Sequence, residues 1–190
     1  MTKPKALLLT PGAGADRNQP SLVAIDDALT AEGLAVSRMD FPYRLAGRKA
    51  PDRPPILVNA VREGAAALAE KANLKPAAVA LGGRSMGGRI CSMAVAEGLP
   101  AAALVLISYP LHPPGKPEKL RIEHLPSLTV PCLFISGTRD AFGTPDELTQ
   151  ATSAIPSKVT HVWIDGGDHG LRRRDAEVAE SVRSWLISGH

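Results

Sequence analysis

The chain has 190 residues, of which 44% are hydrophobic and 22% charged, a composition typical of one globular domain and unlike that of a disordered chain. Its 22 basic and 19 acidic residues leave a formal net charge of +3, and only 4% of the residues are aromatic, so the concentrated basic face and the stacking residues of a nucleic-acid-binding protein are missing. The longest apolar run, Ala101 to Ile107, covers seven positions, against about 20 for a membrane-spanning helix. We therefore expect neither a nucleic-acid partner nor a membrane span.

The start of the sequence resembles a secretory signal, because Lys3 and Lys5 precede an apolar stretch. That stretch, Ala6 to Leu9, is shorter than the roughly 7–15 residues of a signal's apolar region. We therefore expect a buried strand there and a cytoplasmic protein. The two cysteines, Cys91 and Cys132, are too few for a disulfide framework and lack metal-ligand spacing. We expect no metal and no cofactor.

Six short segments rich in aliphatic and β-branched residues predict strands. They are Ala6 to Thr10, Val36 to Asp40, Ala77 to Leu81, Ala102 to Ile107, Cys132 to Ser136 and His161 to Ile164. Helices are predicted by apolar residues at helical spacing, namely Leu22, Ile25 and Leu29, then Leu57, Val61 and Leu68, then Val178, Val182, Trp185 and Leu186. Continuous apolar strands are typical of parallel strands covered by helices on both faces. The alternation predicts a single doubly wound α/β domain over residues 1–190, with a mostly parallel sheet of about six strands.

Two proline-rich stretches interrupt this alternation. Residues 41–55 carry four prolines, and residues 108–131 carry six. Because proline fixes φ and lacks a backbone donor, we expect loops rather than helices in both stretches. Both follow strands, and loops at the carboxyl ends of parallel strands border the ligand crevice of such a sheet. The 108–131 stretch is too short to build a cap domain, so we expect a shallow, open site.

A glycine-rich turn between a predicted strand and a helical segment carries the most informative motif. Residues Gly83 to Gly87 match the G-x-S-x-G nucleophile elbow, in which a serine occupies a sharp strand-to-helix turn. Glycine at both ends of the motif leaves room for the neighbouring backbone. The turn lifts the Ser85 hydroxyl above the sheet and directs the backbone N–H of Met86 toward a developing oxyanion. The competing interpretation, a turn in which Ser85 only caps the helix, stays open.

A serine nucleophile needs a base that accepts its proton and an acid that orients the base. In this type of fold the acid and then the histidine follow the serine at the ends of later strands. Asp140 follows the strand that ends at Ser136, and His169 follows the last predicted strand. We therefore predict Ser85, Asp140 and His169 as the catalytic residues, meeting at one edge of the sheet.

Other histidines and acids fit these roles less well. The candidates are the histidines His112, His124, His161 and His190 and the acids Asp146, Asp165 and Asp168. One of these histidines lies within a predicted strand, one ends the sequence, and the other two belong to the 108–131 stretch, where they face solvent or substrate. Two of the acids are too near His169 in sequence to reach the far side of its ring, and the third falls at a predicted helix start.

The second oxyanion donor is expected in the loop after the first strand. Residues 10–15 contain several small side chains that let backbone N–H groups approach a ligand, and we predict Ala13 as this donor. We predict substrate contacts from Gly12 in the same loop, from Arg84 beside the nucleophile, and from Tyr109 after the fourth strand.

Arginines are frequent near these strand ends. Arg84 and Arg89 flank the elbow, and Arg17, Arg44 and Arg139 lie in the loops that follow strands. Two interpretations stay open for them. They are solvated surface charges, or they form a lip that attracts a carboxylate or phosphate of the substrate.

Three motifs together resemble the α/β-hydrolase superfamily, and more narrowly its small, cap-less, dienelactone-hydrolase-like group. They are Gly-Gly-Arg-Ser-Met-Gly-Gly-Arg at 82–89, Gly-Thr-Arg-Asp at 137–140 and Gly-Asp-His at 167–169, with Phe-Pro-Tyr at 41–43 and Tyr-Pro-Leu-His-Pro at 109–113 as further stretches similar to that group. The resemblance implies a minimal α/β-hydrolase fold and a Ser-Asp-His triad at 85, 140 and 169. The first loop departs from the common His-Gly form, since Pro11 precedes Gly12.

These observations predict a serine hydrolase, similar to a carboxylesterase, that acts on small or protruding acyl substrates through an acyl-enzyme. Two alternatives stay open. One is a catalytically idle interaction module, suggested by eukaryotic relatives of the group in chromatin-associated proteins. The other is an acyltransferase that uses the same triad. The expected partner is a small-molecule acyl substrate, and whether the chain forms a homodimer stays open.

Overall fold

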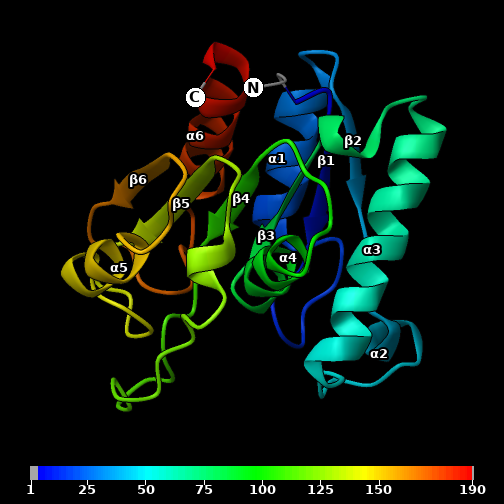
Figure 1. Cartoon of the computed structure of the whole chain (residues 1–190). Helices are drawn as coiled ribbons and strands as arrows, with labels where there is room; N and C mark the ends of the chain where they lie inside the picture. Colours follow the sequence, from blue (N-terminus) through cyan, green and yellow to red (C-terminus); the bar gives the residue numbers. More distant parts are fainter. Residues whose placement is uncertain (1–3, 190) are drawn as a thin grey trace.

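Six parallel strands form one sheet in a computed structural model of the chain, which describes residues 4–189 (Figure 1). Lys3 and His190, named above, lie outside the described residues. The strands are β1 (Ala6–Thr10), β2 (Ala35–Arg38), β3 (Val79–Arg84), β4 (Leu104–Ile107), β5 (Cys132–Gly137) and β6 (Val159–Ile164). Their order across the sheet is β2-β1-β3-β4-β5-β6, and every neighbouring pair is parallel. The predicted α/β fold with a parallel sheet is confirmed.

Helices cover both faces of this sheet. They are α1 (Pro20–Thr30), α2 (Pro42–Leu45), α3 (Pro54–Lys71), α4 (Met86–Ala96), α5 (Pro145–Thr152) and α6 (Asp175–Ser188), with short 3₁₀ turns η1 (Pro76–Ala78) and η2 (Leu125–Ser127). Successive side chains of a strand point to opposite faces. In β1, Leu7 and Leu9 therefore pack with α1 and α6, whereas Leu8 packs with α3 and α4. The sheet is thus buried on both sides, as its continuous apolar strands indicated.

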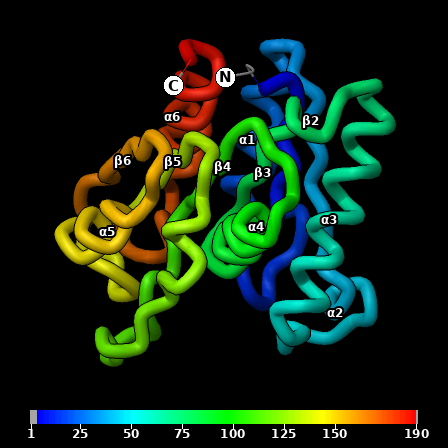
Figure 2. Tube along the Cα trace, viewed as in Figure 1, coloured from blue at the N-terminus to red at the C-terminus, as the bar shows by residue number. Residues whose placement is uncertain are grey.

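The two proline-rich stretches differ in their outcome. The prediction of a loop over 41–55 is wrong at two places, because α2 begins at Pro42 and α3 begins at Pro54. Proline suits the first turn of a helix, where its missing N–H would have no intrahelical partner. The loop predicted over 108–131 is confirmed apart from η2, so no α-helix separates β4 from β5. Figure 2 shows this connection looping away beyond the carboxyl ends of the strands.

The strand order places a crevice between β1 and β3. After β1 the chain moves outward to β2, and after β3 it moves outward in the opposite direction, through β4 and β5 to β6. The loops that leave the carboxyl ends of β1 and β3 therefore diverge, which is where open parallel sheets bind ligands. Among residues 4–189, no helix combines the length and the apolar character needed to cross a membrane.

Candidate active site

The turn between β3 and α4 has a strained backbone. Ser85 separates the strand from the helix, and its φ of 49° and ψ of −116° lie in a region that L-residues rarely adopt. Its backbone N–H donates to the carbonyl of Ile107 on the neighbouring strand at 2.8 Å, which fixes the turn. A Cβ on Gly83 would overlap Thr10, and a Cβ on Gly87 would lie 2.5 Å from the Pro11 carbonyl oxygen. Glycine at both positions lets the turn press against the end of β1.

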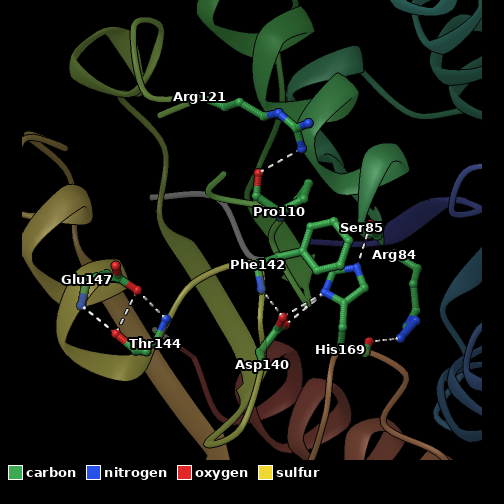
Figure 3. Close-up of polar contacts among 9 residues, drawn as sticks. All are labelled: Arg84, Ser85, Pro110, Arg121, Asp140, Phe142, Thr144, Glu147 and His169. Atoms are coloured by element: carbon green, nitrogen blue, oxygen red, sulfur yellow. Dashed lines mark hydrogen bonds and ion pairs between the residues drawn. The ribbon is translucent and has the colours of Figure 1, made fainter. Parts of the chain in front are cut away.

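The three side chains predicted to form a triad are joined by hydrogen bonds (Figure 3). The distance between Ser85 Oγ and His169 Nε2 is 2.9 Å. On the other side of the ring, His169 Nδ1 lies 2.9 Å from each carboxylate oxygen of Asp140. Asp140 is buried, and its Oδ1 also accepts a hydrogen bond from the backbone N–H of Phe142 at 2.8 Å. The arrangement holds an imidazole between a hydroxyl and a carboxylate.

The loops after β5 and β6 hold each other in register. The backbone N–H of Arg139 donates to the carbonyl of Gly167 at 2.9 Å, so the loop of the acid and the loop of the histidine are directly bonded. Arg84 donates from Nη2 to the carbonyl oxygen of His169. The ring of Phe142 stacks on the imidazole of His169 with centroids 3.9 Å apart and planes inclined by 26°. The orientation of His169 is therefore fixed from its backbone and from one ring face.

A capping box ends the acid's loop at the start of α5. Thr144 Oγ1 accepts from the backbone N–H of Glu147 at 3.3 Å, and Glu147 Oε2 accepts from the backbone N–H of Thr144 at 2.8 Å (Figure 3). These two bonds satisfy donors at the helix start that lack intrahelical partners. The hydrogen bonds lower the pKa of the exposed Glu147 carboxyl. The segment from Asp140 to α5 is thus held at both ends.

Two backbone N–H groups beside Ser85 have no acceptor. Among the described residues, the N–H groups of Ala13 and Met86 donate to no carbonyl or side chain, whereas the N–H of Gly12 donates to Gln19 Oε1 at 3.0 Å. All four residues line a cavity of about 490 Å³ that also contains Ser85 and His169. Free N–H groups at the mouth of a parallel sheet can stabilise an oxyanion. The role of Met86 and Ala13 as oxyanion donors stays a prediction.

The three residues predicted to contact the substrate lie in different positions relative to the cavity. Gly12 and Arg84 line the cavity. The guanidinium of Arg84, however, is buried and bonded to His169, and burial lowers its pKa against the opposing effect of Asp140, Asp175 and Asp168. The structure does not bring Tyr109 to the cavity wall, because its side chain is buried and its hydroxyl donates to the Arg121 carbonyl at 2.6 Å.

A second serine–histidine hydrogen bond lies outside the cavity. Ser92 Oγ is 2.7 Å from His124 Nε2 and donates to the carbonyl oxygen of Arg89 in its own helix at 2.7 Å. Ser92 is fully buried, and His124 has no carboxylate bonded to its other ring nitrogen among residues 4–189. This pair connects α4 to η2. Its hydroxyl is inaccessible to a substrate, unlike that of Ser85.

The His124 imidazole makes the stability of the fold depend on pH. Burial, and then the charge of Arg89, lower its pKa from the ordinary 6.5 to about 4. Between these values the unfolded chain binds a proton that the folded chain does not, so the free energy of unfolding falls as the pH is lowered from about 6.5 toward 4. Replacing His124 with glutamine is expected to reduce this fall by about 1 kcal/mol, given partial screening by solvent. Urea unfolding at pH 7 and pH 4.5 measures it, and equal falls in both proteins would contradict the assignment.

Several residues of the site were not predicted from the sequence, among them Phe142, Gln19 and Arg121. Phe142 follows Asp140 by two positions, so the sequence alone indicates that it lies near the acid. Its stacking on the His169 ring could not be predicted from the sequence. Gln19 and Arg121 reach the cavity only through tertiary contacts.

No group of three or more histidine, cysteine, aspartate or glutamate side chains within the described part of the chain is arranged to hold a metal ion.

Comparison with known proteins identifies the family. Residues 3–185 match the model of an α/β-hydrolase domain family, so the chain belongs to that family. Among solved structures, a dienelactone hydrolase from Anabaena variabilis is 21% identical, with a TM-score of 0.77 over 97% of this chain and 86% of that one. An α/β serine hydrolase homologue from Coxiella burnetii is 18% identical, with a TM-score of 0.75 over 96% and 86% of the two chains. A monoacylglycerol lipase from Paleococcus ferrophilus is 15% identical, with a TM-score of 0.75 over 98% and 96%. At these identities the neighbours establish the fold.

Proposed function

We propose that this protein is a serine hydrolase that cleaves carboxylic esters through an acyl-enzyme, with Ser85 as nucleophile, His169 as base and Asp140 as the orienting acid. The observation that carries the proposal is the unbroken hydrogen-bonded series from Ser85 Oγ through His169 to Asp140, at 2.9 Å for each link, opening into a cavity. The family membership and the esterase and lipase neighbours support the same reaction class.

The reaction proceeds in two halves. His169 Nε2 takes the Ser85 proton as Oγ bonds to the acyl carbon, and the N–H groups of Met86 and Ala13 stabilise the oxyanion. The bond between the acyl carbon and the alcohol oxygen then breaks, and the alcohol leaves with the proton from His169. A water molecule attacks the acyl-enzyme, gives a proton to His169, and the Ser85 oxygen departs with that proton as the acid is released. Asp140 keeps Nδ1 protonated and offsets the imidazolium charge.

The open cavity favours small or protruding acyl groups. The connection after β4 contains no α-helix that could form a cap, and the cavity is bordered mainly by loops at the strand ends. A long lipid chain would therefore stay largely exposed to water, which removes most of the hydrophobic contribution to its binding. We expect short-chain esters to be hydrolysed in preference to long-chain ones.

A fluorophosphonate probe tests the nucleophile directly, because it modifies only a serine that an adjacent base activates. We expect labelling of the wild-type protein, with the modified peptide carrying the adduct on Ser85. Labelling is expected to be lost in Ser85→Ala and to fall at least about 100-fold in His169→Ala. An adduct on Ser92, or no adduct in correctly folded wild-type protein, would contradict the proposal.

A further inference from the structure

The cavity beside Ser85 is lined by positive charge without a compensating carboxylate. Three arginines, Arg84, Arg89 and Arg121, contribute to its wall, and no aspartate or glutamate of the described residues does. The other arginines predicted near the strand ends do not line it. Arg17 pairs with Asp40 at 2.6 Å and Arg44 pairs with Asp16 at 3.6 Å, whereas Arg139 is exposed. The arginine charge in the cavity wall therefore comes from three side chains.

These three arginines are not equivalent. Arg84 is already bound within the protein, because its guanidinium donates to the His169 carbonyl and is influenced by the charges of three aspartates. Arg89 and Arg121 form no ion pair with any carboxylate of the described residues. The Nε of Arg89 is buried and has no acceptor within residues 4–189. A buried donor on a charged group is costly when it stays unpaired, so the described part of the protein does not fully satisfy the charged group of Arg89.

Arg89 and Arg121 also lie close to each other. After burial, the charge of Arg89 is the largest influence that lowers the pKa of Arg121, and it lowers the pKa of His124 as well. Glu97 and Glu123, whose charges act on His124, do not neutralise the pair, since Glu97 is bound to Arg62 at 3.3 Å and Glu123 forms no ion pair with either guanidinium. Two guanidinium groups that line one cavity without a counterion create a field that favours an anion.

Both side chains start from fixed backbone. Arg89 lies one turn into α4, and its N–H donates to the Ser85 carbonyl at 3.1 Å, so its position is tied to the nucleophile. Arg121 is held across the 108–131 connection, where its N–H donates to the Leu111 carbonyl at 2.9 Å and its carbonyl accepts from Tyr109. Its Nη1 donates to the Pro110 carbonyl at 3.2 Å, which leaves its other N–H groups available (Figure 3).

We propose that Arg89 and Arg121 form a subsite for a carboxylate or phosphate group of the substrate, so that the hydrolase selects anionic esters. This inference rests on the proposed function and names the substrate class of the same site. The planar guanidinium fork suits an oxyanion group with two acceptor oxygens. An anion there accepts from the available N–H groups of Arg121 and offsets the like charges of the two arginines.

Matched esters test this selectivity. We compare kcat/KM for 4-nitrophenyl hemisuccinate, which carries a carboxylate on the acyl side, with that for neutral 4-nitrophenyl pentanoate. A second arm compares 3-carboxy-4-nitrophenyl butyrate with 4-nitrophenyl butyrate, which places the carboxylate on the alcohol side, and inorganic phosphate is added as a competitor to test for a phosphate site. We expect Arg121→Gln and Arg89→Gln each to lower the anionic-to-neutral ratio about 10-fold or more in at least one arm.

The exposed Arg139 supplies the control, because Arg139→Gln removes the same charge from a strand-end loop outside the cavity. Its ratio is expected to change by less than about twofold, as for a screened surface charge. The subsite would be overturned if the anionic-to-neutral ratio fell equally in all three variants. It would also be overturned if Arg121→Gln and Arg89→Gln kept the wild-type ratio with their folds intact.

The subsite and the hydrolase proposal fail in different ways. If the wild-type protein cleaves the neutral esters through Ser85 but the arginine variants leave the ratio unchanged, only the subsite is wrong. If no ester is cleaved, the hydrolase proposal is wrong, and binding of succinate by isothermal titration calorimetry then tests the subsite by itself. Binding that is lost in Arg121→Gln supports the subsite, and absence of binding to the wild-type protein rejects it.

Discussion

Replacing Ser85 with alanine is expected to lower kcat for hydrolysis of 4-nitrophenyl butyrate by about 10³- to 10⁶-fold. The variant lacks the oxygen that bonds to the acyl carbon, while His169 and Asp140 remain in place. The fold should persist, because Ser85 contributes no hydroxyl bond other than that to His169 among the described residues. Steady-state kinetics with purified protein, together with a thermal melt of each protein, measure both quantities.

The matched control is Ser92→Ala, which removes the other serine hydroxyl that is bonded to a histidine. That change is expected to leave kcat within about threefold of the wild-type value, since Ser92 is buried outside the cavity. The reverse pattern, with Ser92→Ala inactive and Ser85→Ala active, would move the nucleophile to α4 and end the present assignment.

Replacing Gly137 with alanine is expected to lower the free energy of unfolding by about 2–4 kcal/mol. The new Cβ would overlap the carbonyl group of Gly167 and lie 3.0 Å from the carbonyl oxygen of Asp168. These atoms belong to backbone, so the loop that carries His169 must move away from the end of β5. Urea unfolding gives the loss of stability, and hydrolysis below the unfolding transition gives the accompanying loss of activity.

Gly33→Ala separates this clash from ordinary backbone strain. Gly33 has a φ of +81°, and no described atom lies within 4 Å of the position that an added methyl group would take, so alanine there meets only the cost of a left-handed conformation, about 1–2 kcal/mol. Gly33 also lies in the turn before β2, away from the cavity. If Gly137→Ala lost no more stability than Gly33→Ala and kept full activity, the close approach of the two loops would be refuted as a structural requirement.

The fold could be predicted from the sequence because its strands are short, apolar and regularly spaced. The first strand was predicted with its observed bounds, Ala6–Thr10, since Lys5 precedes the apolar run Ala6 to Leu9 and Pro11 follows the β-branched Thr10. The predictions were weakest near proline. Pro42 and Pro54 start helices, and sequence alone does not distinguish a proline that begins a helix from one that prevents it.

Part of the candidate site could also be predicted from the sequence, and part could not. Ser85, Asp140 and His169 were predicted as partners because parallel strands bring their carboxyl ends to one edge, and the structure joins all three by hydrogen bonds. Their catalytic role stays a prediction. Arg121 was not found, since its place depends on how the 108–131 connection folds back onto Tyr109. A long loop without periodicity gives no sequence signal for such a contact.

The position of β6 bears on how this protein loses function under stress. β6 is an edge strand that pairs only with β5 within the described residues, most of its residues are half-buried, and the loop that follows it carries His169. Edge elements open more readily than central ones. A transient opening of β6 and the loop that follows it would move the His169 imidazole away from Ser85 while the five remaining strands stay folded. The tolerance of the site to heat or denaturant would then be set by one peripheral strand and its loop, not by the large core that keeps the domain together.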